Sequence, residues 1–599
     1  MKATLQDRGR LLGLLVLLTA AGCAEPGQER NDAAAGAAAV ADARQEADLI
    51  LTNAAIYTLD PAQPWAEALA IGAGRILAVG GAGQIAAAYR GETLDLAGQM
   101  VLPGFHDGHS HPVSGGVQML QCDLSAAASV AETLNRIAAC HAATPVDDDP
   151  ASAWLVGGGW DLGLFADANP HKQLLDAIVG DRPVYLRGAD GHSGWASSAA
   201  LARAGISADT ANPPLGVIER DAAGEPTGTL RETAMGLVGA VLPEVTEEQR
   251  VAGALAALEM ANAFGITSLV AASVDAEELA VWRRLEREGR MTVRVVASIS
   301  MNEGADSGAN SRLLAPESRG SEQLVRADAA KIFLDGVLEG ETAALLEPYL
   351  DPQGKGGGRM GDLHVPWEEL RATVVALDAR GVQVHMHAIG DAAVRQGLDA
   401  IAAAREVNGA GDNRHHICHL QLVHPDDYPR FGELGVLANF QALWAYPDEY
   451  ITDINLPAVG AERVQRMYPI RSIEQAGGTI VGGSDWSVSS MNPLDAIEVA
   501  VTRQDPAGLV SGVLNAAEAV TLETMLAAYT RGTAFLMHQE DRSGMLAAGM
   551  LADLVVLDRN LFDLAPSAIN EARVVKTYFS GRLVYSAQGQ MLVDQGIVD

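Results

Sequence analysis

Eight short apolar segments in the middle of this 599-residue chain alternate with alanine-rich stretches of helical periodicity. This alternation favours parallel strands joined by crossover helices, and eight such units predict a closed barrel. The expected strands are residues 100–105, 265–271, 292–298, 329–335, 382–387, 416–420, 436–441 and 479–485. We therefore predict an α/β chain whose main body is a (β/α)8 TIM barrel.

Short apolar segments separated by turns also lie on both sides of the barrel sequence, at residues 48–103 and 545–599. Neither flank can bury a core alone, so we predict one small β-sandwich domain built from both chain ends. The barrel would occupy residues 104–544. Roughly 250 residues suffice for such a barrel, and the excess lies after the first strand, at about residues 112–255. We expect this insertion to cover the barrel mouth, where such barrels carry their active sites.

The N-terminus has the pattern of an export signal. Basic residues precede an apolar run that is too short to span a membrane. The small residues before Cys23 resemble a bacterial lipobox, in which the cysteine is lipidated, and ordinary cleavage near Cys23 is the alternative. We expect a signal peptide over residues 1–23, a flexible linker over residues 24–47, and an exported lipoprotein in the periplasm or on the outer surface.

The formal net charge of −34 excludes some classes of partner. It disfavours nucleic acid, which is bound through basic contacts to phosphates. It equally disfavours anionic lipid surfaces, so membrane contact would come only through the lipid anchor. We expect a small-molecule substrate, and the alanine-rich helices permit a homodimer without requiring one. Export would permit a disulfide between Cys122 and Cys140, with two buried free thiols as the equal alternative.

Histidines are grouped at the ends of three expected strands. Nine of the 14 histidines fall into three clusters: His106, His109 and His111; His385 and His387; His415, His416, His419 and His424. Residues i and i+2 of an extended segment project to the same side, so His109 and His111 can present two imidazoles to one ion. Three clusters at three strand ends of one barrel predict a metal site.

Two charged residues extend this prediction. Lys331 lies inside an apolar strand, where a charge is costly. Reaction with CO2 would make it a carbamate that can bridge two cations, and pairing with Asp335 or contact with solvent is the alternative. Asp485 ends the last expected strand, where a carboxylate can accept a proton from an activated water. A helix N-cap is the alternative role for Asp485.

Ordered motifs resemble those of a known family. Residues 103–111, PGFHDGHSH, resemble the opening PGFxDxHxH of the amidohydrolase superfamily. Residues 331–336 (KIFLDG), 387–391 (HAIGD) and 483–485 (GSD) resemble the signature of its third branch, which includes N-substituted formamide deformylases. The resemblance covers roughly residues 48–590. Within it, Cys418 stands where the family pattern usually has a glutamate, directly before His419.

The resemblance implies a role for each matching residue. The metal ligands would be His109 and His111 for the more buried ion, His387 and His419 for the second, Lys331 as a carboxylated bridge, and Asp485 as ligand and proton shuttle. His192 would face the substrate and assist catalysis, and further pocket positions would be Arg463, Tyr468 and Trp486. The implied cofactor is one or two divalent cations, with Zn²⁺ as the expected metal.

These features predict a metal-dependent hydrolase that cleaves a carbon–nitrogen bond other than a peptide bond, in a small amide, N-formyl compound or carbamate. The same site would suit a lactonase or a deaminase. A surface-tethered binding protein without catalysis is an alternative of a different class. A serine hydrolase is disfavoured, because no GxSxG elbow stands between a strand and a helix.

Overall fold

The computed structural model describes residues 43–144, 153–301, 307–319, 321–351 and 358–588. The predicted signal peptide, Cys23 and nearly all of the predicted linker lie outside these ranges. Within the described ranges, no helix is both long and apolar enough to cross a membrane.

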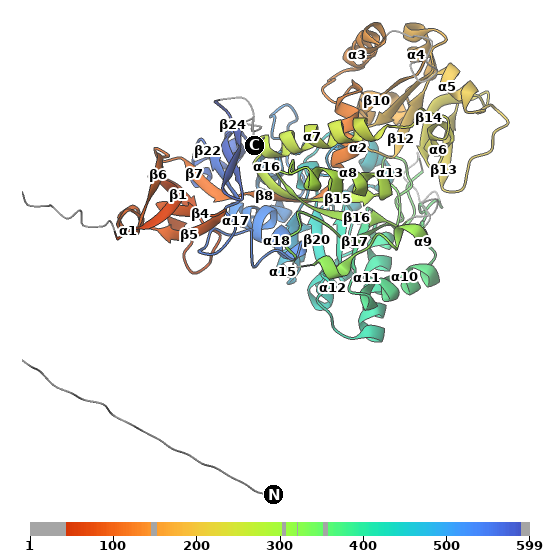
Figure 1. Ribbon diagram of the computed structural model, residues 1–599. Helices are drawn as coiled ribbons and strands as arrows, with labels where there is room; N and C mark the ends of the chain where they lie inside the picture. Colours follow the sequence, from red (N-terminus) through yellow and green to blue (C-terminus); the bar gives the residue numbers. More distant parts are fainter. Residues whose placement is uncertain (1–42, 145–152, 302–306, 320, 352–357, 589–599) are drawn as a thin grey trace, which may run out of the picture. The chain divides into compact units, whose positions relative to one another are not determined.

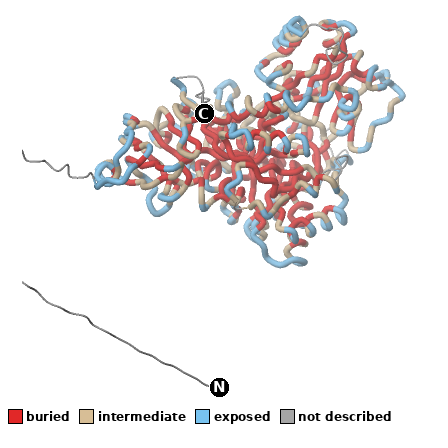
Figure 2. The backbone as a smooth tube through the Cα atoms, viewed as in Figure 1, coloured by how far each residue is buried: buried red, intermediate tan, exposed pale blue. Residues whose placement is uncertain are grey.

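Eight parallel strands form the sheet at the centre of the chain, which confirms the predicted α/β barrel (Figure 1). In spatial order the strands are β21 (Thr479–Gly482), β20 (Leu437–Phe440), β19 (His416–His419), β18 (Gln383–Ala388), β17 (Val325–Phe333), β16 (Arg294–Ser300), β15 (Ile266–Val274) and β8 (Phe105–Ser110). Most of their residues are buried, as the red trace of Figure 2 shows. Such strands are covered on both faces, which explains their continuous apolar runs in the sequence.

The expected first strand, residues 100–105, is corrected by the structure. It is divided between β7 (Met100–Pro103), which belongs to another sheet, and β8. The chain passes between the sheets at Gly104, where an added Cβ would lie 2.3 Å from Thr267 Oγ1. Residues 100–105 form one continuous buried apolar run across the break, so hydrophobic periodicity could not find it.

The barrel closes without a regular ladder between its first and last strands. The Asp485 N–H donates to the His109 carbonyl at 2.7 Å, and the His111 N–H donates to the Trp486 carbonyl at 2.5 Å. Gly483 permits this approach, because an added Cβ there would lie 2.8 Å from the His109 nitrogen. We call these contacts the closing seam. It is therefore built from the backbone of residues predicted to bind metal.

Helices pack around the outside of the barrel. They are α7 (Glu247–Ala263), α8 (Ala276–Arg287), α10 (Trp367–Ala379), α11 (Asp391–Asn408), α12 (Tyr428–Leu434), α15 (Ile470–Gln475), α16 (Pro493–Thr502), α17 (Leu522–Ala527) and α18 (Thr533–Leu536). Their starts follow local capping chemistry: Thr246 and Gln249 form a capping box at α7, and the Asp275 side chain caps α8. Shorter helices are α9 (Ser307–Asn310), α13 (Leu456–Val459) and α14 (Ala461–Val464).

The two flanks of the barrel sequence contribute strands to a shared sheet. Its order is β24 (Arg582–Ser586), β23 (Val574–Phe579), β22 (Leu554–Leu557), β7, β2 (Ala55–Tyr57) and β3 (Trp65–Ala66). A second sheet contains β5 (Arg75–Gly80), β4 (Ala68–Gly72), β1 (Gln45–Thr52) and β6 (Tyr89–Asp95), with α1 (Ala82–Ala88) beside it. Leu51, Ile71, Val101 and Leu554 share one hydrophobic cluster. A buried ion pair between Arg294 and Asp553 links β16 to the start of β22.

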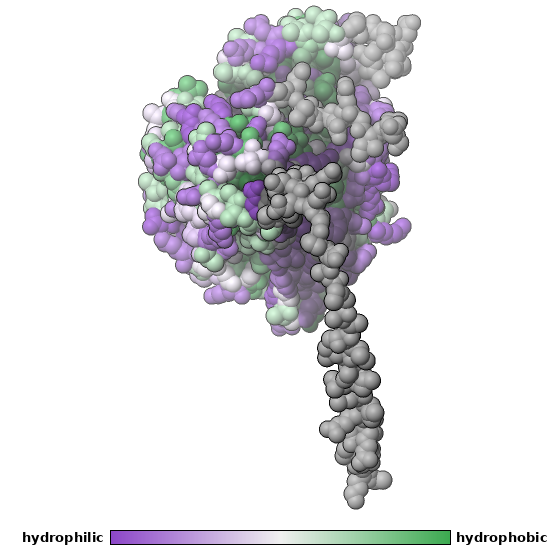
Figure 3. Space-filling view, turned by 60° about the vertical axis from the view of Figure 1, so that its left-hand side comes forward, coloured by the Kyte–Doolittle hydropathy of each residue, from purple (hydrophilic) through white to green (hydrophobic). Residues whose placement is uncertain are grey.

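A separate six-stranded sheet lies between β8 and β15 in the sequence. Its strands are β13 (Gly216–Arg220), β14 (Pro226–Glu232), β12 (Ser193–Ala196), β11 (Val184–Gly188), β10 (Leu155–Trp160) and β9 (Cys122–Asp123). The helices of this insertion are α2 (Pro112–Met119), α3 (Val130–Ala143), α4 (Lys172–Val179), α5 (Ser198–Arg203) and α6 (Met235–Gly239). A disulfide joins Cys122 to Cys140, which decides between the two alternatives for these cysteines. Hydrophilic and apolar residues are intermixed on the face shown in Figure 3.

Candidate metal centre

The residues predicted to bind metal meet at the carboxyl ends of the barrel strands. They are His109 near the end of β8 and His111 directly after it, Lys331 in β17, His387 in β18, His419 at the end of β19, and Asp485 after β21. In (β/α)8 barrels this is the catalytic end. Asp485 lies three residues beyond the last strand, which ends at Gly482 rather than at Asp485 itself.

Asp485 stands between three imidazoles. Its Oδ1 lies 3.1 Å from His109 Nε2 and 3.2 Å from His111 Nε2, and its Oδ2 lies 3.7 Å from His419 Nδ1. His109 Nε2, His419 Nδ1 and Asp485 Oδ1 are buried atoms that make no hydrogen bond. Each such atom costs about 1–3 kcal/mol. One divalent cation placed among them would satisfy all three, so the donor set fits a metal ion.

Burial sets the protonation of the candidate ligands. It lowers the pKa of His109 to about 3, and it lowers the pKa of His387 and of His419 well below the ordinary value. Burial disfavours the charged form of Asp485, but His109, His111 and His419 outweigh it and lower the pKa of this carboxyl. Neutral imidazole and ionised carboxylate are the forms that bind a divalent cation.

Two of these residues adopt left-handed backbone conformations. His419 has φ 76° and Asp485 has φ 54°, values that cost a residue with a Cβ of order 1–3 kcal/mol. Hydrogen bonds hold both turns: the His419 N–H donates to Gln441 Oε1 at 2.9 Å, and the Asp485 N–H belongs to the closing seam. The surrounding structure therefore maintains strain at two candidate ligands.

Other clustered histidines support the ligands. His385 Nε2 lies 2.7 Å from His109 Nδ1, and His385 Nδ1 lies 3.1 Å from Ser298 Oγ. The His385 ring stacks on His416 with centroids 4.0 Å apart. A hydrogen bond to the second ring nitrogen fixes the orientation of a ligating histidine. His385 is thus placed to orient His109.

Three clustered histidines lie elsewhere. His106 contacts the Gly104 carbonyl and Ser543 Oγ, each at 3.0 Å, and His415 Nε2 lies 2.9 Å from Asp378 Oδ1. His424 accepts a hydrogen bond at the start of a short 3-10 helix. These are structural histidines.

Asp107 was not singled out in the sequence, although the PGFxDxHxH motif contains it. Its carboxylate accepts the His109 N–H at 3.0 Å, the Ser484 N–H at 2.9 Å and the Ser484 hydroxyl at 2.5 Å. It therefore ties the two strand ends that carry His109 and Asp485.

Lys331 is fully buried, and it neither pairs with Asp335 nor reaches solvent. Its Nζ donates to Cys418 Sγ at 3.5 Å and lies 4.7 Å from the centroid of the Phe333 ring. Asp335 instead accepts the backbone N–H groups of Ala344, Ile389 and Gly390. Burial lowers the pKa of Lys331 and raises that of Cys418 to about 12.

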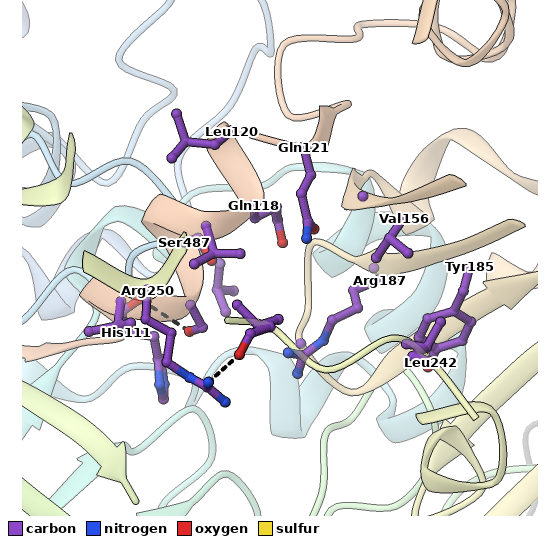
Figure 4. Close-up of a pocket in the computed structure, with 18 of the residues that line it drawn as sticks. His111, Gln118, Leu120, Gln121, Val156, Tyr185, Arg187, Leu242, Arg250 and Ser487 are labelled. Carbon is purple, nitrogen blue, oxygen red and sulfur yellow. Dashed lines mark hydrogen bonds between the residues drawn. The ribbon is translucent and has the colours of Figure 1, made fainter. Parts of the chain in front are cut away.

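A cavity of about 1100 Å³ opens over these residues, large enough for a small-molecule substrate. Its floor includes Lys331, His387, His419 and Asp485. The insertion contributes walls that include Tyr185, Arg187, His192 and Gln118. In Figure 4, the side chains of Arg187 and Arg250 extend toward the middle of this cavity. The catalytic end of the barrel and the insertion thus enclose one space.

His192 enters this cavity from the insertion, and its ring centroid lies 5.3 Å from that of His387. Its Nδ1 lies 2.9 Å from Glu232 Oε2, and Glu232 Oε1 accepts the Thr342 hydroxyl at 2.8 Å. Burial alone would lower the pKa of His192, but the Glu232 carboxylate raises it to about 9. The sequence did not reveal Glu232, because its proximity depends on the pairing of β12 with β14.

Three residues predicted to bind substrate lie away from this cavity. The Arg463 guanidinium donates to the carbonyls of Val459, Glu347 and Pro348. Tyr468 is buried in an apolar cluster, and Trp486 packs in the main hydrophobic core. Arg463 and Tyr468 were assigned by resemblance alone. Trp486 was assigned because it directly follows Asp485, but its own side chain turns into the core.

Comparison with known proteins gives a consistent relationship. Residues 92–585 match the amidohydrolase family. The chain is 32% identical over 561 residues to the protein LONG AFTER FAR-RED 3 of Arabidopsis thaliana, covering 90% of this chain and 92% of that protein. It is 29% identical over 564 residues to the N-substituted formamide deformylase of Arthrobacter pascens, covering 91% of this chain and 99% of that protein. The structure of an uncharacterized metal-dependent hydrolase from Pyrococcus furiosus has a TM-score of 0.64 and 26% identity, covering 86% of this chain and 99% of that chain.

Proposed function

The chain belongs to the amidohydrolase family, and from this premise we propose that it hydrolyses a small amide, N-formyl compound or carbamate. The observation that carries the proposal is the group of buried polar atoms without a hydrogen bond on His109, His419 and Asp485, at the floor of a cavity of about 1100 Å³. The Arthrobacter relative is named for deformylation of N-substituted formamides, which supports an N-formyl substrate class.

We further propose that the metal is Zn²⁺, as one or two ions. His109, His111, His387, His419 and Asp485 would hold it. Imidazole and carboxylate together suit zinc. When bound, the cation polarises a carbonyl group and lowers the pKa of a water molecule. A pair of ions would require an anionic bridge, and a carbamate on Lys331 would be one source of it.

Asp485 and His192 then have separate roles, Asp485 in proton transfer and His192 in stabilising negative charge. Asp485 accepts the proton of the attacking water and donates it to the departing nitrogen, a role that requires an ionised carboxylate at the start. His192, kept protonated by Glu232, donates a hydrogen bond to the substrate oxygen on which negative charge develops. Because Glu232 and Thr342 fix the imidazole before the substrate arrives, little reorganisation is needed during the reaction.

The purified full chain tests this function against a panel of N-formyl, N-acyl, carbamate and lactone substrates, with metal content measured by mass spectrometry. Hydrolysis of C–N substrates by zinc-containing protein is the expected result. Faster opening of lactones would replace the proposed reaction with lactone hydrolysis. Folded protein with neither metal nor hydrolysis would favour the non-catalytic binding protein.

A pH profile tests the pair of His192 and Glu232. The kcat/KM should decline above about pH 9, where His192 loses its proton. Glu232→Gln removes the charge that raises this pKa, so burial then lowers it and the alkaline decline moves toward neutral pH. With one oxyanion donor weakened, kcat/KM at pH 8 should fall by about 10²-fold.

The matched control for this profile is Glu219→Gln. Glu219 pairs with Arg231 at 3.2 Å in the same sheet of the insertion and should leave the profile unchanged. An alkaline limb at the same pH in Glu232→Gln and in the wild type would show that His192 does not control it.

We also propose that the chain is exported and lipidated on Cys23. Cells fed a labelled fatty acid should incorporate label into the full chain, and Cys23→Ser should abolish the label and release the protein from the membrane fraction. Cys418→Ser, which alters a buried thiol, is the control and should retain the label. Unlabelled wild-type protein would indicate ordinary cleavage near Cys23 instead.

A further inference from the structure

Cys418 is a buried thiol inside the barrel, between the predicted ligands. It lies on β19, directly before His419, and its side chain is inaccessible to solvent. Cys122 and Cys140 are bonded to each other, so among the described residues Cys418 is the one free cysteine. The mechanism proposed above gives it no role.

The ligand atoms of His109, Cys418 and His419 all lie within 4.8 Å of one another. Two of these residues present unpaired atoms, since His109 Nε2 and His419 Nδ1 are buried without a hydrogen bond. The thiol donates to the Met386 carbonyl at 3.2 Å, a contact that leaves sulfur lone pairs available. Imidazole nitrogen and thiolate sulfur are both common ligands of zinc.

Lys331 lies beside the sulfur atom of Cys418. The distance from its Nζ to Cys418 Sγ is 3.5 Å. An ammonium group beside a thiolate is an attractive pair in a medium of low dielectric constant. A carbamate on Lys331 would instead bring a second anion against the sulfur atom, in a site that already contains Asp485.

We infer that Cys418 binds the metal through its sulfur atom together with His109 and His419, whose ligand atoms lie within 4.8 Å of one another. This inference rests on the metal site of the proposed function and specifies its ligands. When the sulfur–metal bond forms, the thiol proton leaves the sulfur atom, and the Lys331 amine 3.5 Å away can accept it. Cys418 then takes the place of the glutamate that is usual before this histidine and provides the anionic ligand that a carbamate would otherwise supply.

The inference also predicts the metal preference of the site. Thiolate is a soft ligand that selects zinc over magnesium and manganese, which prefer oxygen ligands. Magnesium or manganese should therefore restore far less activity to metal-free protein than zinc or cobalt.

Cobalt substitution tests the sulfur–metal bond directly. The full chain, freed of metal by chelation and reloaded with Co²⁺, should show a sulfur-to-cobalt charge-transfer band in the near ultraviolet. Cys418→Ser should bind cobalt more weakly and lack this band, whereas its Co²⁺ ligand-field bands in the visible should remain. The same preparation, equilibrated with ¹³C-bicarbonate, should show no carbamate carbon by NMR.

The outcomes separate this inference from the proposed function. Wild-type protein that binds cobalt and hydrolyses substrate without the charge-transfer band would overturn the role of Cys418 and leave the hydrolase intact. A carbamate signal that Lys331→Met removes would return the bridging role to Lys331. Protein that binds no cobalt would overturn the metal site and both proposals together. Because the wild-type spectrum alone can decide, the test does not depend on how well the variant folds.

Discussion

Replacing Asp485 by asparagine is expected to lower kcat/KM by about 10³–10⁴-fold, the upper part of the range for loss of a general base. Asparagine has the same shape, but it can neither accept the proton of a water molecule nor balance the charge of a cation. The backbone hydrogen bond from residue 485 to His109 does not involve the side chain, so the closing seam should persist. Steady-state kinetics with thermal unfolding as the folding check measure both effects.

The control for this substitution is Asp563→Asn, which neutralises an exposed carboxylate in a 3-10 helix near the C-terminal flank. It should leave kcat/KM within twofold of the wild type. An Asp485→Asn protein that retains a tenth or more of wild-type kcat/KM would show that another group moves the proton, and Asp485 would then be a ligand at most.

Removal of the metal is expected to abolish hydrolysis and to lower the melting temperature. A cation present at 1000 times its Kd stabilises the folded state by about 4 kcal/mol, which corresponds to a few degrees for a chain of this size. The physical cause is the group of buried polar atoms on His109, His419 and Asp485, which make no hydrogen bond within the protein. Calorimetry and activity assays before and after chelation give the two readouts.

Zinc added back to the chelated protein should restore both quantities. Treatment with chelator already saturated with zinc is the control and should change neither. If mass spectrometry shows that the metal is gone while hydrolysis continues, the reaction does not depend on it.

The sequence predicted the barrel strands well, because each is a short apolar run and these runs alternate regularly with helical stretches. It also predicted that the candidate ligands would meet, because they follow strand ends of one barrel. The histidine pattern alone could not separate His387 from His385, since both face inward on β18, and the family resemblance singled out His387. Two residues span roughly 6–7 Å along a strand, so His385 lies one layer deeper and contacts His109 rather than the cavity.

The sequence could not predict side-chain contacts between residues that are distant in the chain. Glu232 reaches His192 only because β12 and β14 pair, and Cys418 reaches Lys331 only because β17, β18 and β19 are adjacent in the barrel. Arg463 shows the opposite error. A resemblance placed it in the pocket, whereas its guanidinium is occupied by three backbone carbonyls.

The closing seam has a consequence for how this protein is made. Asp107 and Ser484, which are hydrogen-bonded beside it, are 377 residues apart. Until the last strand has been synthesised, β8 has an unpaired edge, and edges of this kind are prone to pair with other chains. Contacts between residues so distant in sequence form slowly. The cation therefore cannot join the two ends of the barrel until synthesis is nearly complete, and a chain truncated before Asp485 should aggregate rather than acquire metal.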